Sequence, residues 1–163
     1  MTTEKHDYFK DPPPRRVGTL GLLERDGQFV IISRSYWTEV SRWGLPGGTA
    51  DANELPRRAF SRLMAEKLGG LRVTASALLA VDHSPEWPGR FHEGVNFVYH
   101  VPLPSDADVT VTDGRGYVEA RWVDEKTVGE LAVDHELARI LQCLEAVRDG
   151  TTKELLVGLP MRI

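Results

Sequence analysis

A glycine-rich turn and the helix predicted after it hold the residues whose types and spacing could do chemistry. The segment from Trp43 to Gly69 reads WGLPGGTADANELPRRAFSRLMAEKLG. Four charged residues recur at every fourth position in its second half, and they are Glu54, Arg58, Arg62 and Glu66. Residues four apart lie one above the other on a helix, so this spacing predicts a single charged stripe. Glycine lets backbone carbonyls approach a ligand closely, so the turn beside the stripe suits a metal ion bound to a phosphorylated ligand.

The rest of the chain supplies the elements that must position this segment. Runs rich in β-forming residues predict strands at residues 17–24, 28–34, 72–81, 94–101, 109–112 and 117–123. Turn signals that contain glycine join the first two and the last two of these runs, which predicts two hairpins. Helices are expected at about 55–68 and 134–148, a loop at 35–41, and a short strand or a tail at 153–163. This order predicts an α/β/α sandwich around a mixed β-sheet.

Length and composition limit the class of protein. A chain of 163 residues is expected to form one domain at 17–150, after a flexible N-terminal tail at 1–16 and before a C-terminal extension at 151–163. The net charge of −4 makes nucleic acid an unlikely partner. The single cysteine, Cys143, excludes an internal disulfide and fits a reducing compartment. The sequence has neither an apolar run long enough to span a membrane nor an apolar signal core near its start, so we expect a cytoplasmic protein.

The segment resembles the Nudix box, which reads G-x5-E-x7-R-E-U-x-E-E-x-G-U with U an aliphatic residue. Six residues match this signature at the correct spacing, and they are Gly48, Glu54, Arg62, Met64, Glu66 and Gly69. Leu45-Pro46 and Gly47 fit the usual lead-in. The resemblance extends more weakly over about residues 15–150, and it implies the Nudix fold for the whole domain.

The resemblance also implies a chemistry. Nudix proteins hydrolyse a nucleoside diphosphate linked to another group, with Mg²⁺ or Mn²⁺ held by acids of the box so that the ion bridges the diphosphate and activates a water. Hard cations prefer oxygen ligands, which is why carboxylates and a glycine carbonyl serve here. The family thus implies a phosphorylated small molecule as ligand, and a homodimer is a family-level expectation.

Two of the three acids of the R-E-U-x-E-E motif are missing. The three positions fall on Leu63, Glu66 and Lys67, so one ligand is lost and another is replaced by a positive charge. A branch of the family, the GDP-mannose mannosyl hydrolases, looks similar in its Arg-Leu pair, but its surviving acid falls where this chain has Lys67. An ordinary multi-metal Nudix site therefore cannot assemble from the box residues alone.

Two arrangements could complete the site. In the first, Glu119 joins Glu66 and the carbonyl of Gly48 to hold a single ion, with Glu66, Arg62 and Glu119 as the catalytic candidates. In the second, Lys67 supplies a fixed cation in place of the metal, because an ammonium is a good phosphate partner. Arg62 is then expected to brace the glycine loop together with Glu54.

Four residues are candidates for substrate binding, and they are Arg34, Lys67, Trp87 and Phe91. Trp87 and Phe91 lie in a proline-flanked loop and could cover a base or a sugar, although packing against each other explains such aromatics equally well. Two functions follow. One is a slow or atypical Mg²⁺-dependent hydrolase of a nucleoside diphosphate derivative, and the other is a catalytically inactive Nudix domain that binds a phosphorylated ligand or a protein partner.

Overall fold

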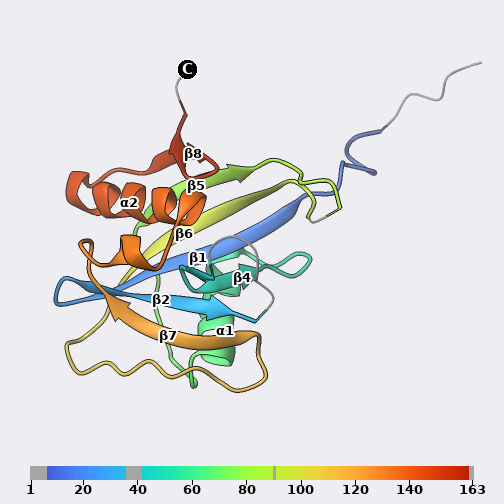
Figure 1. The fold of residues 1–163 in the computed structure, drawn as a ribbon. Helices are drawn as coiled ribbons and strands as arrows, with labels where there is room; N and C mark the ends of the chain where they lie inside the picture. The colour runs from blue at the N-terminus through green and yellow to red at the C-terminus, as the bar shows by residue number, and fades with distance from the viewer. Residues whose placement is uncertain (1–6, 36–41, 90, 162–163) are drawn as a thin grey trace, which may run out of the picture.

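In the computed structural model the two helices lie on opposite sides of one mixed sheet (Figure 1). The structure describes residues 7–35, 42–89 and 91–161. Within them the strands are β1 (Arg16–Arg25), β2 (Gln28–Arg34), β3 (Trp43–Gly44), β4 (Gly47–Thr49), β5 (Leu78–Ser84), β6 (Gly94–Pro102), β7 (Tyr117–Val123), β8 (Lys153–Leu156) and β9 (Leu159–Pro160). The helices are α1 (Pro56–Lys67), a 3-10 turn η1 (Val128–Glu130) and α2 (Asp134–Asp149).

The sheet divides into two halves that diverge from the hairpin of β1 and β2. The two strands pair only next to their turn, at Glu24 with Phe29 and Arg25 with Gln28. Beyond that point β1 pairs with β4 and runs parallel to β6, whereas β2 pairs with β3 and β7. The glycine strand β4 and the end of β2 consequently lie where the two halves separate, which is where the box residues meet the rest of the fold.

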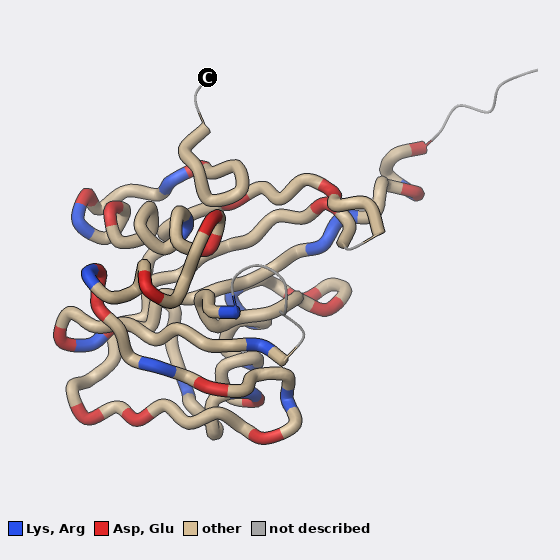
Figure 2. Tube along the Cα trace, viewed as in Figure 1, with Lys and Arg blue, Asp and Glu red and all other residues tan. Residues whose placement is uncertain are grey.

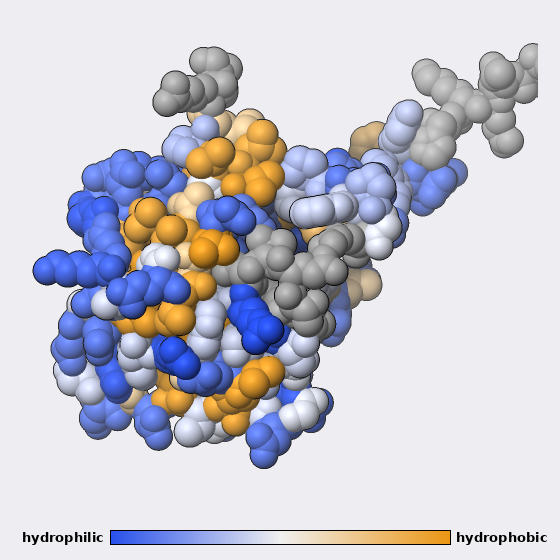
Figure 3. Space-filling model, in the orientation of Figure 1, coloured by the Kyte–Doolittle hydropathy of each residue, from blue (hydrophilic) through white to orange (hydrophobic). Residues whose placement is uncertain are grey.

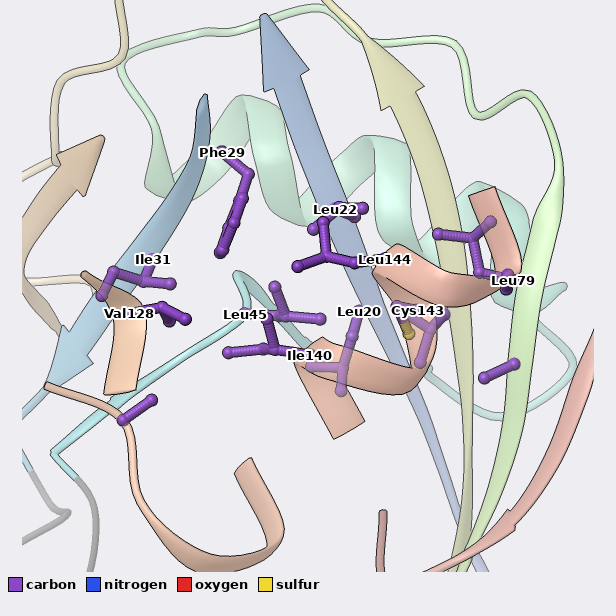
Figure 4. Close-up of a cluster of buried hydrophobic side chains, with 14 of the residues drawn as sticks. Leu20, Leu22, Phe29, Ile31, Leu45, Leu79, Val128, Ile140, Cys143 and Leu144 are labelled. Carbon is purple, nitrogen blue, oxygen red and sulfur yellow. The ribbon is translucent and has the colours of Figure 1, made fainter. Parts of the chain in front are cut away.

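Alternating residues of β2 supply two apolar cores. Phe29 and Ile31 belong to the cluster that packs under α2 (Figure 4), and Val30 and Ile32 belong to the cluster that packs against α1. A strand with apolar residues on both faces must be covered on both sides, because successive side chains point in opposite directions. The predicted α/β/α arrangement with a mixed sheet is therefore confirmed.

Two predicted strands differ from the structure: one begins later than predicted, and the other does not form. The strand expected at 72–81 begins only at Leu78, because the residues before it run beside the start of α1, where Arg57 donates to the carbonyl oxygen of Ser76 at 3.0 Å. Residues 109–112 form no strand and no hairpin with β7. Thr112 instead donates its backbone N–H to the carbonyl oxygen of Lys67 at 2.8 Å and accepts from the N–H of Gly69 at 2.9 Å. The apolar pattern there reflects packing against α1 rather than strand pairing.

The C-terminal segment belongs to the sheet. β8 runs parallel to β5, and β9 folds back on β8. The strand alternative for the segment 153–163 is thus confirmed as far as Pro160. Of the loop expected at 35–41, only Ser35 lies inside the described residues.

The surface of the described residues is mixed in character. In the view of Figure 2 acidic and basic residues are interspersed over the fold. Figure 3 shows apolar side chains gathered on one face over α2 and the C-terminal strands. The exposed large apolar residues of these elements are Leu141, Leu156 and Leu159. The homodimer stays a prediction, since the structure contains one chain.

The helix α1 is held on the sheet by a close approach between Phe60 and β1. Phe60 is fully buried, and a Cβ added to Gly21 on β1 would overlap the Phe60 ring. Glycine at this position lets the aromatic ring lie directly on the backbone of β1. The contact fixes the height of α1 above the sheet and, with it, the position of the box residues.

We expect Gly21→Ala to lower the free energy of unfolding by about 1–3 kcal/mol, the usual cost of overpacking a core. Urea denaturation measures the change. Gly129→Ala is the matched control, because its new Cβ would meet only Leu137 at an ordinary 3.8 Å, and it should change stability by less than about 0.5 kcal/mol. In a Phe60→Leu background the added methyl group should cost less, and an equal cost in both backgrounds would contradict the proposed contact.

Candidate functional site

The glycine loop is held against β1 so closely that side chains are excluded from it. Gly47 and Gly48 on β4 pair with Leu20 and Thr19. A Cβ added to Gly47 would overlap the carbonyl oxygen of Thr19. A Cβ added to Gly48 would lie 3.0 Å from Leu63 Cδ1 and 3.5 Å from Lys67 Nζ. The two residues that depart from the family signature therefore cover Gly48 with a methyl group and an ammonium.

A carboxylate–guanidinium pair braces the loop against α1. The Glu54 carboxylate accepts two hydrogen bonds from Arg62, from Nε and Nη2, each at 2.8 Å, and a third from the backbone N–H of Asp51 at 2.9 Å. These bonds, the Arg62 bonds foremost, lower the pKa of Glu54 to about 2. The same pairing raises the pKa of Arg62. The bidentate geometry fits the bracing role expected of both residues, and both oxygens of the Glu54 carboxylate are engaged in it.

Lys67 is partly buried beside Gly48. Its Nζ lies 4.8 Å from the centre of the Tyr117 ring, within the range of a cation–π contact. Burial lowers the pKa of Lys67, and the positive charge of Arg34 lowers it further. The structure therefore brings together Lys67, Arg34 and Gly48, three of the predicted site residues.

Tyr117 links these groups, and sequence reasoning missed it. Its hydroxyl donates to the carbonyl oxygen of Gly47 at 2.5 Å and accepts from the N–H of Gly47 at 2.6 Å. Arg34 lies 5.5 Å from the same ring and donates from Nη2 to the carbonyl oxygen of Leu45 at 3.0 Å. The only signal in the sequence was a tyrosine at the start of a strand, a residue type that needs a partner for its hydroxyl when it is buried.

Glu66 faces solvent on α1. Its side chain is 42% exposed, and its carboxylate lies 3.4 Å from Arg62 Nη1. A pair this exposed contributes little to stability, so Glu66 is free of a strong structural duty. Of the predicted catalytic residues, Glu66 and Arg62 are thus neighbours on one face of the helix.

Glu119 does not lie with Glu66. The register of β7 on β2 places it opposite Ser33, two residues from Ile31, which packs under α2. Its carboxylate instead lies 2.6 Å from Arg121 Nε. Successive residues of a strand alternate between faces, so Glu119 is directed to the α2 side of the sheet. Glu66 lies on α1, on the opposite side. The geometry gives no support to an ion shared by the two.

The donor set does not fit the metal centre that the box implies. Among the described residues no three His, Cys, Asp or Glu side chains gather to hold an ion. The space at the predicted ligand Gly48 is occupied by the apolar Leu63 and the cationic Lys67. Hard divalent ions need several oxygen ligands, and a fixed ammonium repels them. The expected Mg²⁺ or Mn²⁺ site built from Gly48, Glu66 and Glu119 is therefore not supported by these residues.

Trp87 and Phe91 contact each other in the turn between β5 and β6. Their rings are 5.9 Å apart in an edge-to-face arrangement, and both remain substantially exposed. The turn ends at Gly94, which pairs with Arg16, whereas Gly48 pairs with Thr19. At about 3.3 Å per residue the end of this turn, Gly94, lies about 10 Å along β1 from Gly48. Its role in substrate binding stays a prediction.

A sequence model of the NUDIX domain matches residues 12–143. The chain belongs to the Nudix family. The ADP-ribose pyrophosphatase of Methanocaldococcus jannaschii is 28% identical over 120 residues, which cover 74% of this chain and 68% of that protein. The crystal structure of a MutT Nudix hydrolase from Burkholderia pseudomallei is 28% identical with a TM-score of 0.58, and the match covers 70% of this chain and 86% of that chain.

The fold recurs in more distant members of the family. A Nudix hydrolase from Nitrosomonas europaea is 19% identical with a TM-score of 0.70, and the match covers 88% of this chain and 79% of that chain. The family and the fold class predicted from the box are both confirmed. Nudix hydrolases act on phosphorylated small molecules and generally use divalent metals. None of the described helices is long and apolar enough to cross a membrane.

The brace makes stability depend on pH through Glu54. The folded-state pKa of about 2 lies below the ordinary value of 4.5, so the contribution of Glu54 to stability is complete above pH 4.5 and is lost as the pH falls toward 2. We therefore expect wild type to be more stable than Glu54→Gln at pH 6, with the difference shrinking as the pH falls through this window. Urea denaturation at several pH values measures it. Glu66→Gln is the control and should change little, and a Glu54→Gln difference that stayed constant with pH would contradict the assignment.

Proposed function

We propose that this Nudix domain binds a nucleoside diphosphate linked to another group, and that Lys67 supplies the positive charge that a box metal ion supplies in other members. Hydrolysis is then slow or absent. The observation that carries the proposal is the position of the Lys67 ammonium at Gly48, with the Arg34 guanidinium near the same Tyr117 ring.

Electrostatics supports binding without a metal. A diphosphate carries two to three negative charges, and an anion in a partly buried pocket needs cations beside it. Lys67 and Arg34 are two cations close enough for one to lower the pKa of the other. An anion placed beside them would relieve that repulsion, which supports a phosphate group as the ligand.

The same residues argue against efficient hydrolysis. Water attack on a diphosphate requires an activated water and added neutralisation of the charge that develops. Leu63 replaces one acid of the box and is buried, and the remaining acid, Glu66, is paired with Arg62. Neither Leu63 nor Glu66 therefore provides an unpaired carboxylate at Gly48.

The second candidate function is slow hydrolysis with a single weakly held ion at Glu66. Two observations favour it, namely the exposed and lightly engaged Glu66 carboxylate and the relative whose name is ADP-ribose pyrophosphatase. ADP-ribose is accordingly the first compound to try, beside a panel of other nucleoside diphosphate derivatives.

Calorimetric titration distinguishes ligand binding through the Lys67 ammonium from ligand binding through a metal ion. We expect inorganic pyrophosphate and ADP-ribose to bind wild type in the presence of EDTA, and Lys67→Met to bind at least about tenfold more weakly, because a charge-assisted contact is lost. Lys126→Met, which removes an exposed lysine of the same length, is the control. If added Mg²⁺ strengthened binding to wild type by orders of magnitude, or if Lys67→Met bound as tightly as wild type, the metal-free pocket would be refuted.

Restoring the missing acids tests the loss of catalysis. With Mg²⁺ or Mn²⁺ and ADP-ribose, we expect Leu63→Glu/Lys67→Glu to release nucleoside monophosphate faster than wild type. Lys67→Glu alone serves as a second variant in case a carboxylate at the buried position 63 prevents folding. Equal turnover in wild type and both variants would show that the missing acids are dispensable. Loss of any wild-type turnover on Glu66→Gln would favour the single-ion candidate.

A further inference from the structure

A shift in strand register turns Tyr117 toward the α1 side of the sheet. Glu119 of β7 lies opposite Ser33 of β2, on the α2 side. The next pair is Tyr117 with Arg34, so the register skips Val118. In a regular strand Tyr117 would share the face of Glu119, because side chains two residues apart point the same way. Instead Val118 is 63% exposed, and Tyr117 is buried in the core cluster against α1. Bulges that redirect a side chain in this way are common beside functional sites.

The hydroxyl of Tyr117 fixes its ring on the glycine loop. It donates to the carbonyl oxygen of Gly47 at 2.5 Å and accepts from the N–H of the same residue at 2.6 Å. Both bonds end on backbone atoms of β4, which lies so close to β1 that a Cβ at Gly47 has no room. The ring is tied at its polar end and buried along its body, so it presents a fixed face.

The ammonium of Lys67 lies over this ring. Its Nζ is 4.8 Å from the ring centre and 3.5 Å from the position that a Cβ added to Gly48 would take. Lysine has a long flexible stem and a strongly hydrated head, so an ammonium in a partly buried place needs a stabilising contact. The need is real here, because burial and the charge of Arg34 both lower the pKa of Lys67. A cation over an aromatic face supplies such a contact.

We propose that Tyr117 is the positioning residue of the phosphate pocket: its ring holds the Lys67 ammonium at Gly48, and its hydroxyl holds the ring at Gly47. The inference rests on the proposed function for its effect on binding. Phosphate affinity then depends on a residue of β7 that lies outside the box and acts through Lys67. A tyrosine that served packing alone would change stability and leave the lysine where it is, so the two roles are separable by experiment.

The chain offers a matched control in Tyr99. Tyr99 is 4% exposed and Tyr117 is 5% exposed, and both belong to the core cluster against α1. The Tyr99 ring also faces a cation from α1, since the Arg57 guanidinium lies 4.7 Å from its centre. Tyr99→Leu therefore removes the same side chain from the same core and leaves the contact between Lys67 and Tyr117 in place.

The first test needs no ligand. Protons above an aromatic face resonate upfield, so we expect the Cε protons of Lys67 in ¹³C-labelled protein to lie upfield of those of the exposed Lys126. Lys67→Arg assigns the signal. The upfield shift should be kept in Tyr117→Phe and in Tyr99→Leu and lost in Tyr117→Leu. A Lys67 signal that Tyr117→Leu leaves unchanged overturns the proposal. So does a wild-type Lys67 signal without the upfield shift, and this outcome decides the matter even if Tyr117→Leu folds poorly.

The second test is a double-mutant cycle on pyrophosphate affinity. We expect Tyr117→Leu to weaken binding about tenfold in wild type, but less than twofold when Lys67 is already replaced by methionine, because the ring acts through the lysine. Tyr99→Leu should change the affinity less than twofold. The same factor for Tyr117→Leu in both backgrounds overturns the proposal. If wild type binds no pyrophosphate while the Lys67 signal depends on the Tyr117 ring, the positioning role stands and the proposed function fails.

Discussion

The positive charge beside Gly48 is the ammonium of Lys67, and it disfavours a divalent metal ion at the same place. The backbone of β4 lies against β1 without room for side chains, and Leu63 and Lys67 close over Gly48 from α1. An ammonium beside Gly48 would repel a divalent ion bound at the same residue. The lysine at position 67 therefore disfavours a metal ion at Gly48. In the proposed function the same lysine favours the binding of an anion there.

The charges that hold the loop are distinct from the charges that would do chemistry. Glu54 and Arg62 satisfy each other through two short hydrogen bonds, and the loop is further fixed by the hydroxyl of Tyr117 on Gly47. None of these contacts requires an ion. The glycine loop and α1 can accordingly keep the geometry of the family while the metal ligands change, which is consistent with a signature that retains its glycines, Glu54 and Arg62 but has lost two of the three acids at 63, 66 and 67.

The sequence predicted the parts of the fold that depend on local signals. Helix α1 has proline in its first turn and glycines of positive φ after its end, and the hairpin of β1 and β2 turns at Asp26-Gly27, both with positive φ. Contacts between distant segments could not be read in the same way. Thr112 satisfies the end of α1 instead of extending a strand, and the register of β7 directs Glu119 away from Glu66. Tyr117 gained its role only through its approach to Gly47, some 70 residues away.

The buried charges under α2 are a separate group from the charges at the glycine loop. Asp82 and Glu136 share Arg139, which joins β5 to α2. At the glycine loop the Lys67 ammonium lies beside Gly48, and its neighbour Glu66 is exposed and engaged by Arg62. Under the proposed function, Lys67 and Arg34, which both lie near the Tyr117 ring, are the cations that a phosphate group would contact. These two charges are placed by β2 and α1, and their positions depend on no metal ion.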